Sequence, residues 1–250
     1  MECNIKKINI NFDFTSDTPN YWDCFYAGEN RPDPDAKSPT MRQYQQMIYS
    51  KILPNGEFLE LKQGNNAKQY LYWKDFCFGS DSIINMYIHH KTLQTLSNDV
   101  NREIPDFDKF YEEYLRKSYT IGGEIIFPKY PKSINVERGR YNGKIKDRFD
   151  LTLECIRLYY NNKQSPLYDT LKANHKFFEL FLDFKGYVDF FYLNDLVSDD
   201  YKSINFYLDF DNFNRTDPRP QTVEEWNILY NRQMEFLNKR NSRIDKSFNG

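Results

Sequence analysis

A dense aromatic segment between residues 174 and 196 sets the strongest limit on the fold of this chain. Phenylalanines stand on both sides of Gly186, at Phe177, Phe178, Phe181, Phe184, Phe190 and Phe191. Because a phenylalanine removes a large apolar area from water when it is buried, we predict two short, largely buried helices that are broken at Gly186. Aromatic residues make up 18% of the 250 residues, and disordered chains lack that content. A disordered protein is therefore excluded, and aromatic side chains are expected to form much of the core.

Charge and hydropathy exclude further classes of protein. The 34 lysines and arginines nearly balance the 36 aspartates and glutamates, for a net charge of -2. This balance excludes a globally basic nucleic-acid binder but leaves room for a local basic patch. No run approaches the roughly 20 apolar residues that cross a bilayer, so no membrane partner is expected. The first residues contain no secretory signal, and we expect a cytoplasmic protein.

Local signals predict several helices and short strands. Helix starts are indicated by Ser38-Pro39, by Asp106, by Asp147 as an N-cap, and by the capping box Thr222–Glu225, whose helix runs to about Ile244. Alternation or buried apolar runs predict strands at Ile5–Phe14, Glu57–Leu61, Gln69–Phe78, Thr120–Phe127 and Ile204–Phe210. The chain is therefore predicted to be one α+β domain over residues 1–250. It should have more helix than strand, a small, mostly antiparallel sheet packed against helices, and a long C-terminal helix.

The loop that precedes the Asp147 helix is the leading candidate for a binding site. Between residues 138 and 148 lie five basic residues, and the two glycines Gly139 and Gly143 let the backbone approach an anion. The loop then enters a helix N-terminus, which favours phosphate. We expect ligand contacts from Arg138, Gly139, Arg140, Lys144 and Arg148. The alternative is an ordinary solvated loop, since the glycine spacing of nucleotide-binding motifs is missing.

Two carboxylates on the helix after this loop are the candidate catalytic residues. Asp150 and Glu154 are four residues apart and share a helix face, where paired carboxylates serve as acid and base or bind a divalent metal. Arg157 offers Glu154 an ordinary ion pair as the alternative. No metal site is predicted, because the histidines at 89, 90 and 175 and the four cysteines lack ligand spacing. The cysteines are expected to be reduced thiols.

Three long runs resemble a widespread bacterial family, the domain of unknown function 6994. They are TIGGEIIFPKYPKSINVERG, DRFDLTLECIRLYY and FFELFLDFKGYVDFFYLNDLV. The resemblance implies one self-contained unit that occurs as a stand-alone bacterial or phage-encoded protein, and it implies no activity or ligand. Its matching positions include Arg138, Gly139, Asp147, Arg148, Asp150 and Glu154. Leu158 stands where the family pattern has a second arginine after Arg157.

The sequence supports two hypotheses about function and leaves open whether the protein is an enzyme or uses a cofactor. The first is a protein that binds or acts on a phosphate-bearing ligand, nucleotide or RNA, through the loop, with Arg138, Arg140 and Arg148 on the phosphate. The second is a non-catalytic interaction protein of a mobile element or phage that binds a host protein. A concave pocket ringed by the basic loop favours the first, and a flat exposed aromatic patch favours the second.

Overall fold

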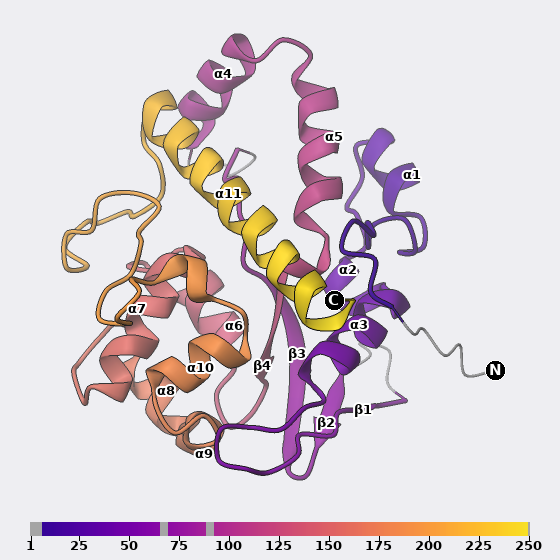
Figure 1. Ribbon diagram of the computed structural model, residues 1–250. Coiled ribbons are helices and arrows are strands. Elements are labelled where there is room, and N and C mark those ends of the chain that lie inside the picture. The colour runs from indigo at the N-terminus through magenta and orange to yellow at the C-terminus, as the bar shows by residue number, and fades with distance from the viewer. Residues whose placement is uncertain (1–6, 66–69, 89–92, 250) are drawn as a thin grey trace.

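The computed structural model of the chain describes residues 7–65, 70–88 and 93–249, with the side chains at 140 and 141 excepted (Figure 1). Helix accounts for 48% of the structure and strand for 9%, which confirms the predicted α+β class with more helix than strand. The helices are α1 (Tyr21–Tyr26), α2 (Pro34–Lys37), α3 (Pro39–Tyr49), α4 (Gln94–Glu103), α5 (Phe107–Ser118), α6 (Ile134–Val136), α7 (Phe149–Tyr160), α8 (Tyr168–Ala173), α9 (His175–Glu179), α10 (Phe184–Phe190) and α11 (Val223–Phe248).

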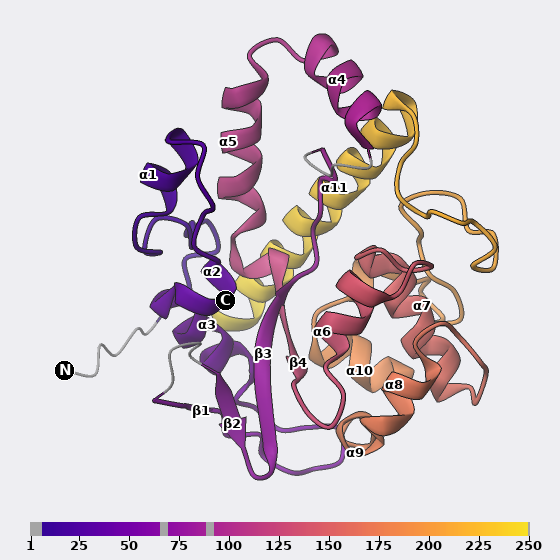
Figure 2. The same ribbon diagram turned by 180° about the vertical axis from the view of Figure 1, so that it is seen from behind.

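One small antiparallel sheet lies at the centre. Its strands are β1 (Lys62–Gln63), β2 (Leu71–Trp73), β3 (Phe76–Ser82) and β4 (Glu124–Pro128), paired in the order β1-β2-β3-β4. All of β4 is buried, which fits the apolar residues 125–128, and the charged Glu124 at its start is buried with them. Figures 1 and 2 show α7 to α10 gathered on one side of the sheet and α1 to α3 on the other. Helix α11 runs diagonally across the molecule, with α4 and α5 on one side of it and α7 to α10 on the other.

Side-chain caps begin the helices whose starts carried the clearest signals. The Ser38 hydroxyl accepts a hydrogen bond from Met41 N at 3.1 Å, and the Thr222 hydroxyl accepts one from Glu225 N at 3.1 Å. The long C-terminal helix is confirmed. Asp147 is not the predicted cap, because Arg148 occupies the N-cap position of α7. Asp147 instead has a positive φ of 67° and turns its carboxylate to other partners.

Several predicted strands are wrong. The described part of Ile5–Phe14 consists of turns, and the segments 57–61 and 204–210 contain only isolated bridges at Phe58 and Ile204. The described part of the predicted strand Gln69–Phe78 is a hairpin rather than one strand, since Lys74 adopts a φ of 48° between β2 and β3. Alternation alone does not supply a hydrogen-bonding neighbour, and these segments pack on helices instead.

The aromatic segment forms the predicted buried core but breaks at another place. The helix break falls at residues 180–183, where Leu182 has a φ of 66°, and Gly186 lies inside α10. Gly186 is required there for close packing, because a Cβ would lie 2.1 Å from the Phe181 carbonyl oxygen. The Tyr187 and Phe191 rings pack with centroids 4.8 Å apart. The buried Arg240 of α11 ties this region to the sheet by donating to the Glu124 carbonyl at 2.8 Å.

Candidate functional site

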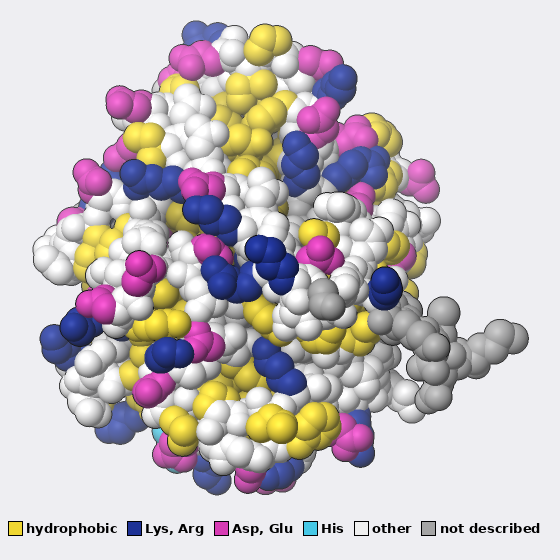
Figure 3. Space-filling view, viewed as in Figure 1, with side chains coloured by type: hydrophobic (Ala, Val, Ile, Leu, Met, Phe, Trp, Pro, Cys, Tyr) yellow, Lys and Arg dark blue, Asp and Glu magenta, His cyan; other side chains and the backbone are white. Residues whose placement is uncertain are grey.

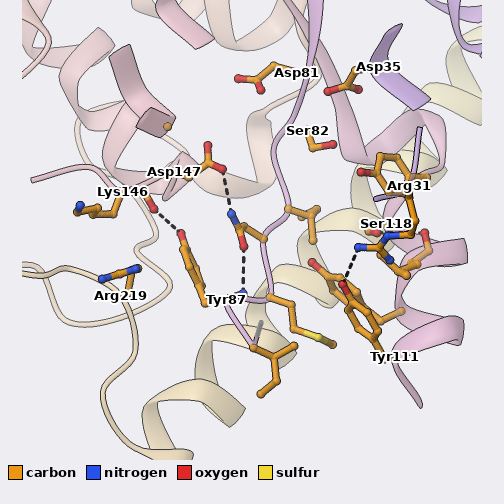
Figure 4. Close-up of a pocket in the computed structure, with 18 residues that line it drawn as sticks. Arg31, Asp35, Asp81, Ser82, Tyr87, Tyr111, Ser118, Lys146, Asp147 and Arg219 are labelled. Carbon is orange, nitrogen blue, oxygen red and sulfur yellow. Dashed lines mark hydrogen bonds between the residues drawn. The ribbon is translucent and has the colours of Figure 1, made fainter. Parts of the chain in front are cut away.

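A polar cavity of about 480 Å³ opens where segments distant in the sequence meet (Figure 4). Its walls come from the loop before α2, the chain after β3, α5, the turn before α7 and the loop before α11. The residues that line it are Arg31, Asp35, Asp81, Ser82, Ile84, Asn85, Met86, Tyr87, Ile88, Tyr111, Tyr114, Leu115, Ser118, Tyr119, Gly139, Lys146, Asp147 and Arg219. The cavity thus combines carboxylates, cations and tyrosines, the mixture that polar small-molecule sites use to orient a ligand.

Arg31 provides a cation without an acidic partner in the described part of the chain. Its guanidinium carbon lies 5.5 Å from the ring centroids of Tyr21, Phe25 and Tyr111. Its Nη2 donates to the Tyr111 hydroxyl at 3.1 Å. Its Nη1 is buried, and within residues 7–65, 70–88 and 93–249 it has no hydrogen-bond partner. The aromatic rings therefore hold the guanidinium in place while one of its donors stays available.

Two more buried polar atoms that line the cavity are likewise unsatisfied in the described part of the chain. The Tyr114 side chain is 4% exposed, and its hydroxyl lacks a hydrogen-bond partner. Asp35 Oδ1 is also buried without a donor. Because buried polar groups are normally paired, these atoms mark places that a ligand or water fills.

A buried carboxyl group, Glu124, lies next to Asp35 beside the cavity. Burial raises the pKa of Glu124 well above its usual value, and the neighbouring charge of Asp35 and a hydrogen bond between the two carboxyls raise it further. Glu124 is fully buried and accepts hydrogen bonds from Ser82 at 3.0 Å and Ser80 at 3.3 Å. Burial and the charge of Asp35 also raise the pKa of Asp33 to about 6. Asp33, which does not itself line the cavity, therefore exchanges its proton at about pH 6.

An arginine links two further acids at the cavity wall. Arg138 is fully buried, and its Nη1 lies 2.6 Å from Asp81 Oδ2 and 2.7 Å from Asp147 Oδ1. Asp147 Oδ2 accepts a hydrogen bond from Asn85 Nδ2 at 2.9 Å, and the Asn85 amide oxygen accepts one from Tyr87 N at 3.0 Å. Tyr87 and Asp147 both have positive φ, a strained conformation that clusters at functional sites.

The residues predicted from the sequence as ligand contacts or catalytic acids lie in different parts of the structure. Gly139 lines the cavity, whereas Arg138 lies behind Asp81 and Asp147. Lys144 donates to the carbonyls of Asn214 and Arg215, and the side chain of Arg140 lies outside the described part. Arg148 and Asp150 form a buried ion pair with each other. Glu154 forms the expected ion pair with Arg157, at 2.7 Å. Lys144, Arg148, Asp150 and Glu154 do not line the cavity.

Sequence reasoning missed the residues that distinguish this cavity. Arg31, Asp35, Asp81 and Tyr114 come from separate segments and follow no motif spacing. One local signal is visible only in the structure: residues Glu137–Tyr141 form a π-helical turn, a feature that frequently accompanies functional sites. That turn places Gly139 at the cavity wall and Arg138 behind Asp81 and Asp147.

The described residues also bear on metals, thiols and membranes. They contain no group of three or more side chains able to hold a metal ion. Cys24, Cys77 and Cys155 are free thiols, and Cys3, His89 and His90 lie outside the described residues. Across the described ranges, no helix has the length and apolar character needed to cross a membrane.

Comparison with known proteins places the chain in a sequence family but does not assign an activity. The model of a family of unknown function (DUF6994) matches residues 8–244, in agreement with the resemblance noted from the sequence. No curated protein and no solved structure matches the chain.

Proposed function

The chain belongs to the DUF6994 family of unknown function, and we propose that this protein binds a small phosphate-bearing ligand of the nucleotide class in the polar cavity. The observation that carries the proposal is Arg31, which lines the cavity, is held among aromatic rings and has a buried donor without a partner in the described chain. A buried guanidinium N–H without an acceptor is costly, and a phosphate supplies both the charge and the acceptor oxygens that a guanidinium fits.

The neighbouring unsatisfied atoms complement such a ligand. Tyr114 offers a second donor for a phosphate oxygen, while Asp35 Oδ1 needs a donor such as a ribose hydroxyl or a base amino group. Figure 4 shows Lys146 across the cavity from Arg31, where a second anionic group is favoured. The nearby Arg219 is already paired with Asp217. The volume of about 480 Å³ lies in the range of ordinary ligand pockets, about 300–1,000 Å³. One nucleotide, free or at the end of an RNA, suits this space.

The ligand class remains the one expected from the sequence, but the phosphate is now expected at Arg31 rather than in the basic loop before α7. The basic loop contributes Gly139, Lys146 and Asp147 to the cavity wall. Arg138 and Arg148 each lie against aspartates, so their charges are already balanced. Arg31, whose charge is not balanced in this way within the described chain, is the better phosphate ligand.

A host-protein interface has less support. It requires a flat exposed aromatic patch, whereas the hydrophobic side chains on the face in Figure 3 form separate patches between charged groups. The most exposed aromatic side chains of the described residues belong to different segments: Tyr26, Phe58, Tyr72 and Tyr130. The concave cavity therefore favours ligand binding over a protein interface.

Calorimetric titration with AMP, adenosine and inorganic phosphate tests the proposal. AMP should bind more tightly than adenosine, and Arg31→Gln should weaken AMP binding about 10- to 100-fold, because hydrogen bonds to charged groups contribute about 1.5–3 kcal/mol. Tyr114→Phe should weaken AMP binding without lowering the melting temperature, since the hydroxyl it removes is unsatisfied in the described part of the folded protein.

Lys109→Gln is the matched control, because Lys109 is exposed on α5 and does not line the cavity. It should bind AMP like the wild type. Equal affinity of wild type and Arg31→Gln for every nucleotide and for short RNA, with both proteins folded, would contradict the proposed function.

A further inference from the structure

Two aspartates of the cavity lie close enough together to act on one bond. Asp81 Oδ2 and Asp147 Oδ1 both contact Arg138 Nη1, at 2.6 Å and 2.7 Å. The separation of these two oxygens therefore cannot exceed the sum of their distances from Arg138 Nη1. This upper limit excludes the roughly 6.5–9.5 Å spacing of inverting glycosidases and is compatible with the closer carboxyl pair of retaining enzymes, about 5–5.5 Å. Both side chains are partly exposed, at 18% and 34%, and both line the cavity.

The two carboxyl groups have different surroundings. The Asp147 carboxylate forms an ion pair with Arg138 and accepts a hydrogen bond from Asn85, and together these contacts hold it in one orientation. Burial raises the pKa of Asp81 to about 7, because the charges of Asp147 and Asp35 add to desolvation and outweigh the opposing charge of Arg138. Different environments for two adjacent carboxyls are the arrangement by which one serves as acid and the other as nucleophile.

The cavity has a second feature that points to a ligand at these acids. Tyr114 is more than nine-tenths buried, and its hydroxyl lines the same cavity without a partner in the described chain. Figure 4 shows Asp81 and Asp147 across the cavity from Arg31. A nucleotide whose phosphate contacts Arg31 therefore extends its ribose toward the two aspartates.

We propose that Asp81 and Asp147 hydrolyse the N-glycosidic bond of a bound nucleoside monophosphate, with Asp147 as the nucleophile and Asp81 as the acid and then the base. This inference rests on the proposed function, because the phosphate at Arg31 positions the ribose. The positively charged sugar of the transition state is stabilised by the adjacent carboxylate.

The reaction proceeds in two steps. In the first, a carboxylate oxygen of Asp147 bonds to ribose C1′ while the bond from C1′ to the base nitrogen breaks, and Asp81 gives its proton to that nitrogen. In the second, water attacks C1′, Asp81 takes a proton from the water, and the bond between C1′ and Asp147 breaks. One water is consumed, the free base and ribose 5-phosphate are released, and both aspartates return to their starting states.

The test incubates the full chain with each nucleoside monophosphate and follows free base by chromatography. Wild type should release base, and Asp81→Asn should lower turnover about 10²- to 10⁴-fold, the usual contribution of a general acid or base, while still binding the nucleotide. Asp108→Asn, at an exposed position on α5 outside the cavity, should retain wild-type turnover.

A second readout separates catalysis from structural damage. With Asp147→Ala, added azide should restore cleavage and yield a glycosyl azide, because a small anion can replace the missing nucleophile. With wild type, added methanol should give methyl riboside phosphate of retained configuration. Nucleotide binding that depends on Arg31 but brings no base release would overturn this inference and leave the proposed function standing. Absence of any nucleotide binding would overturn both.

Discussion

Arg148 and Asp150 form an ion pair inside the protein, where the two side chains are 1% and 0% exposed. Arg148 Nε lies 3.1 Å from Asp150 Oδ1, and Asp150 Oδ2 also accepts a hydrogen bond from Tyr207 N at 2.9 Å. Arg148 Nη1 donates to the Pro218 carbonyl at 2.9 Å. The pair therefore joins the start of α7 to the loop that precedes α11 and leaves neither side chain facing the cavity.

Asp150→Asn should lower the free energy of unfolding strongly. The substitution leaves the Arg148 charge buried without its counter-charge, which typically costs about 3–5 kcal/mol. Urea unfolding followed by circular dichroism measures the effect. Glu235→Gln breaks the exposed ion pair of Glu235 with Lys239 and should leave the unfolding midpoint unchanged. Equal midpoints for Asp150→Asn and wild type would show that this buried pair does not stabilise the fold.

Gly123→Ala should be the most disruptive glycine substitution near the sheet. A Cβ at residue 123 would lie 1.8 Å from the Ser118 carbonyl oxygen, at the end of α5. Because that contact is with backbone, relief requires α5 to shift, and overpacking of this kind costs at least about 1–3 kcal/mol. Gly143→Ala is the control, since no atom of the described residues lies within 4 Å of its added Cβ. Thermal unfolding of both variants provides the comparison. A similar drop in melting temperature for both would contradict the close approach of Gly123 to the Ser118 carbonyl.

Glu124→Gln should change how stability depends on pH. The pKa of Glu124 is raised in the folded protein above its unfolded value of about 4.3, chiefly by burial. The stability contributed by its proton is therefore complete below about pH 4.3 and is lost as the pH rises through the folded pKa. Each unit by which the folded pKa exceeds the unfolded pKa changes the free energy of unfolding by about 1.4 kcal/mol.

The amide introduced by Glu124→Gln has no proton to lose in this range, so the variant should lose less stability than wild type as the pH rises. Asp33 and Asp81 titrate in both proteins, and the difference between the two isolates Glu124. Urea unfolding from about pH 4.5 to about pH 8.5 provides the comparison, since this range begins near the unfolded pKa. Glu113→Gln, on the exposed side of α5, should follow the wild-type profile, and parallel profiles for Glu124→Gln and wild type would rule out the raised pKa.

The parts of the fold that depend on neighbouring residues were predictable. Ser38 and Thr222 cap their helices because a hydroxyl reaches a backbone N–H three residues ahead, and that geometry is contained in the local sequence. The ion pair of Glu154 with Arg157 is local in the same way. The strand predicted at residues 57–61 failed because a strand also needs a neighbour, which local alternation does not specify.

The sequence by itself determined where the capped helices α3 and α11 begin and that aromatic side chains fill the interior, since capping and burial follow from residue type and short spacing. Only the tertiary structure decided which charges face the cavity. Arg138 meets Asp81 across 57 positions, and Asn85 meets Asp147 across 62. An arginine in a basic loop and an arginine beside aromatic residues look alike in a sequence. Whether a carboxylate balances the charge depends on chain segments that only folding brings together: acids surround Arg138, and aromatic rings surround Arg31.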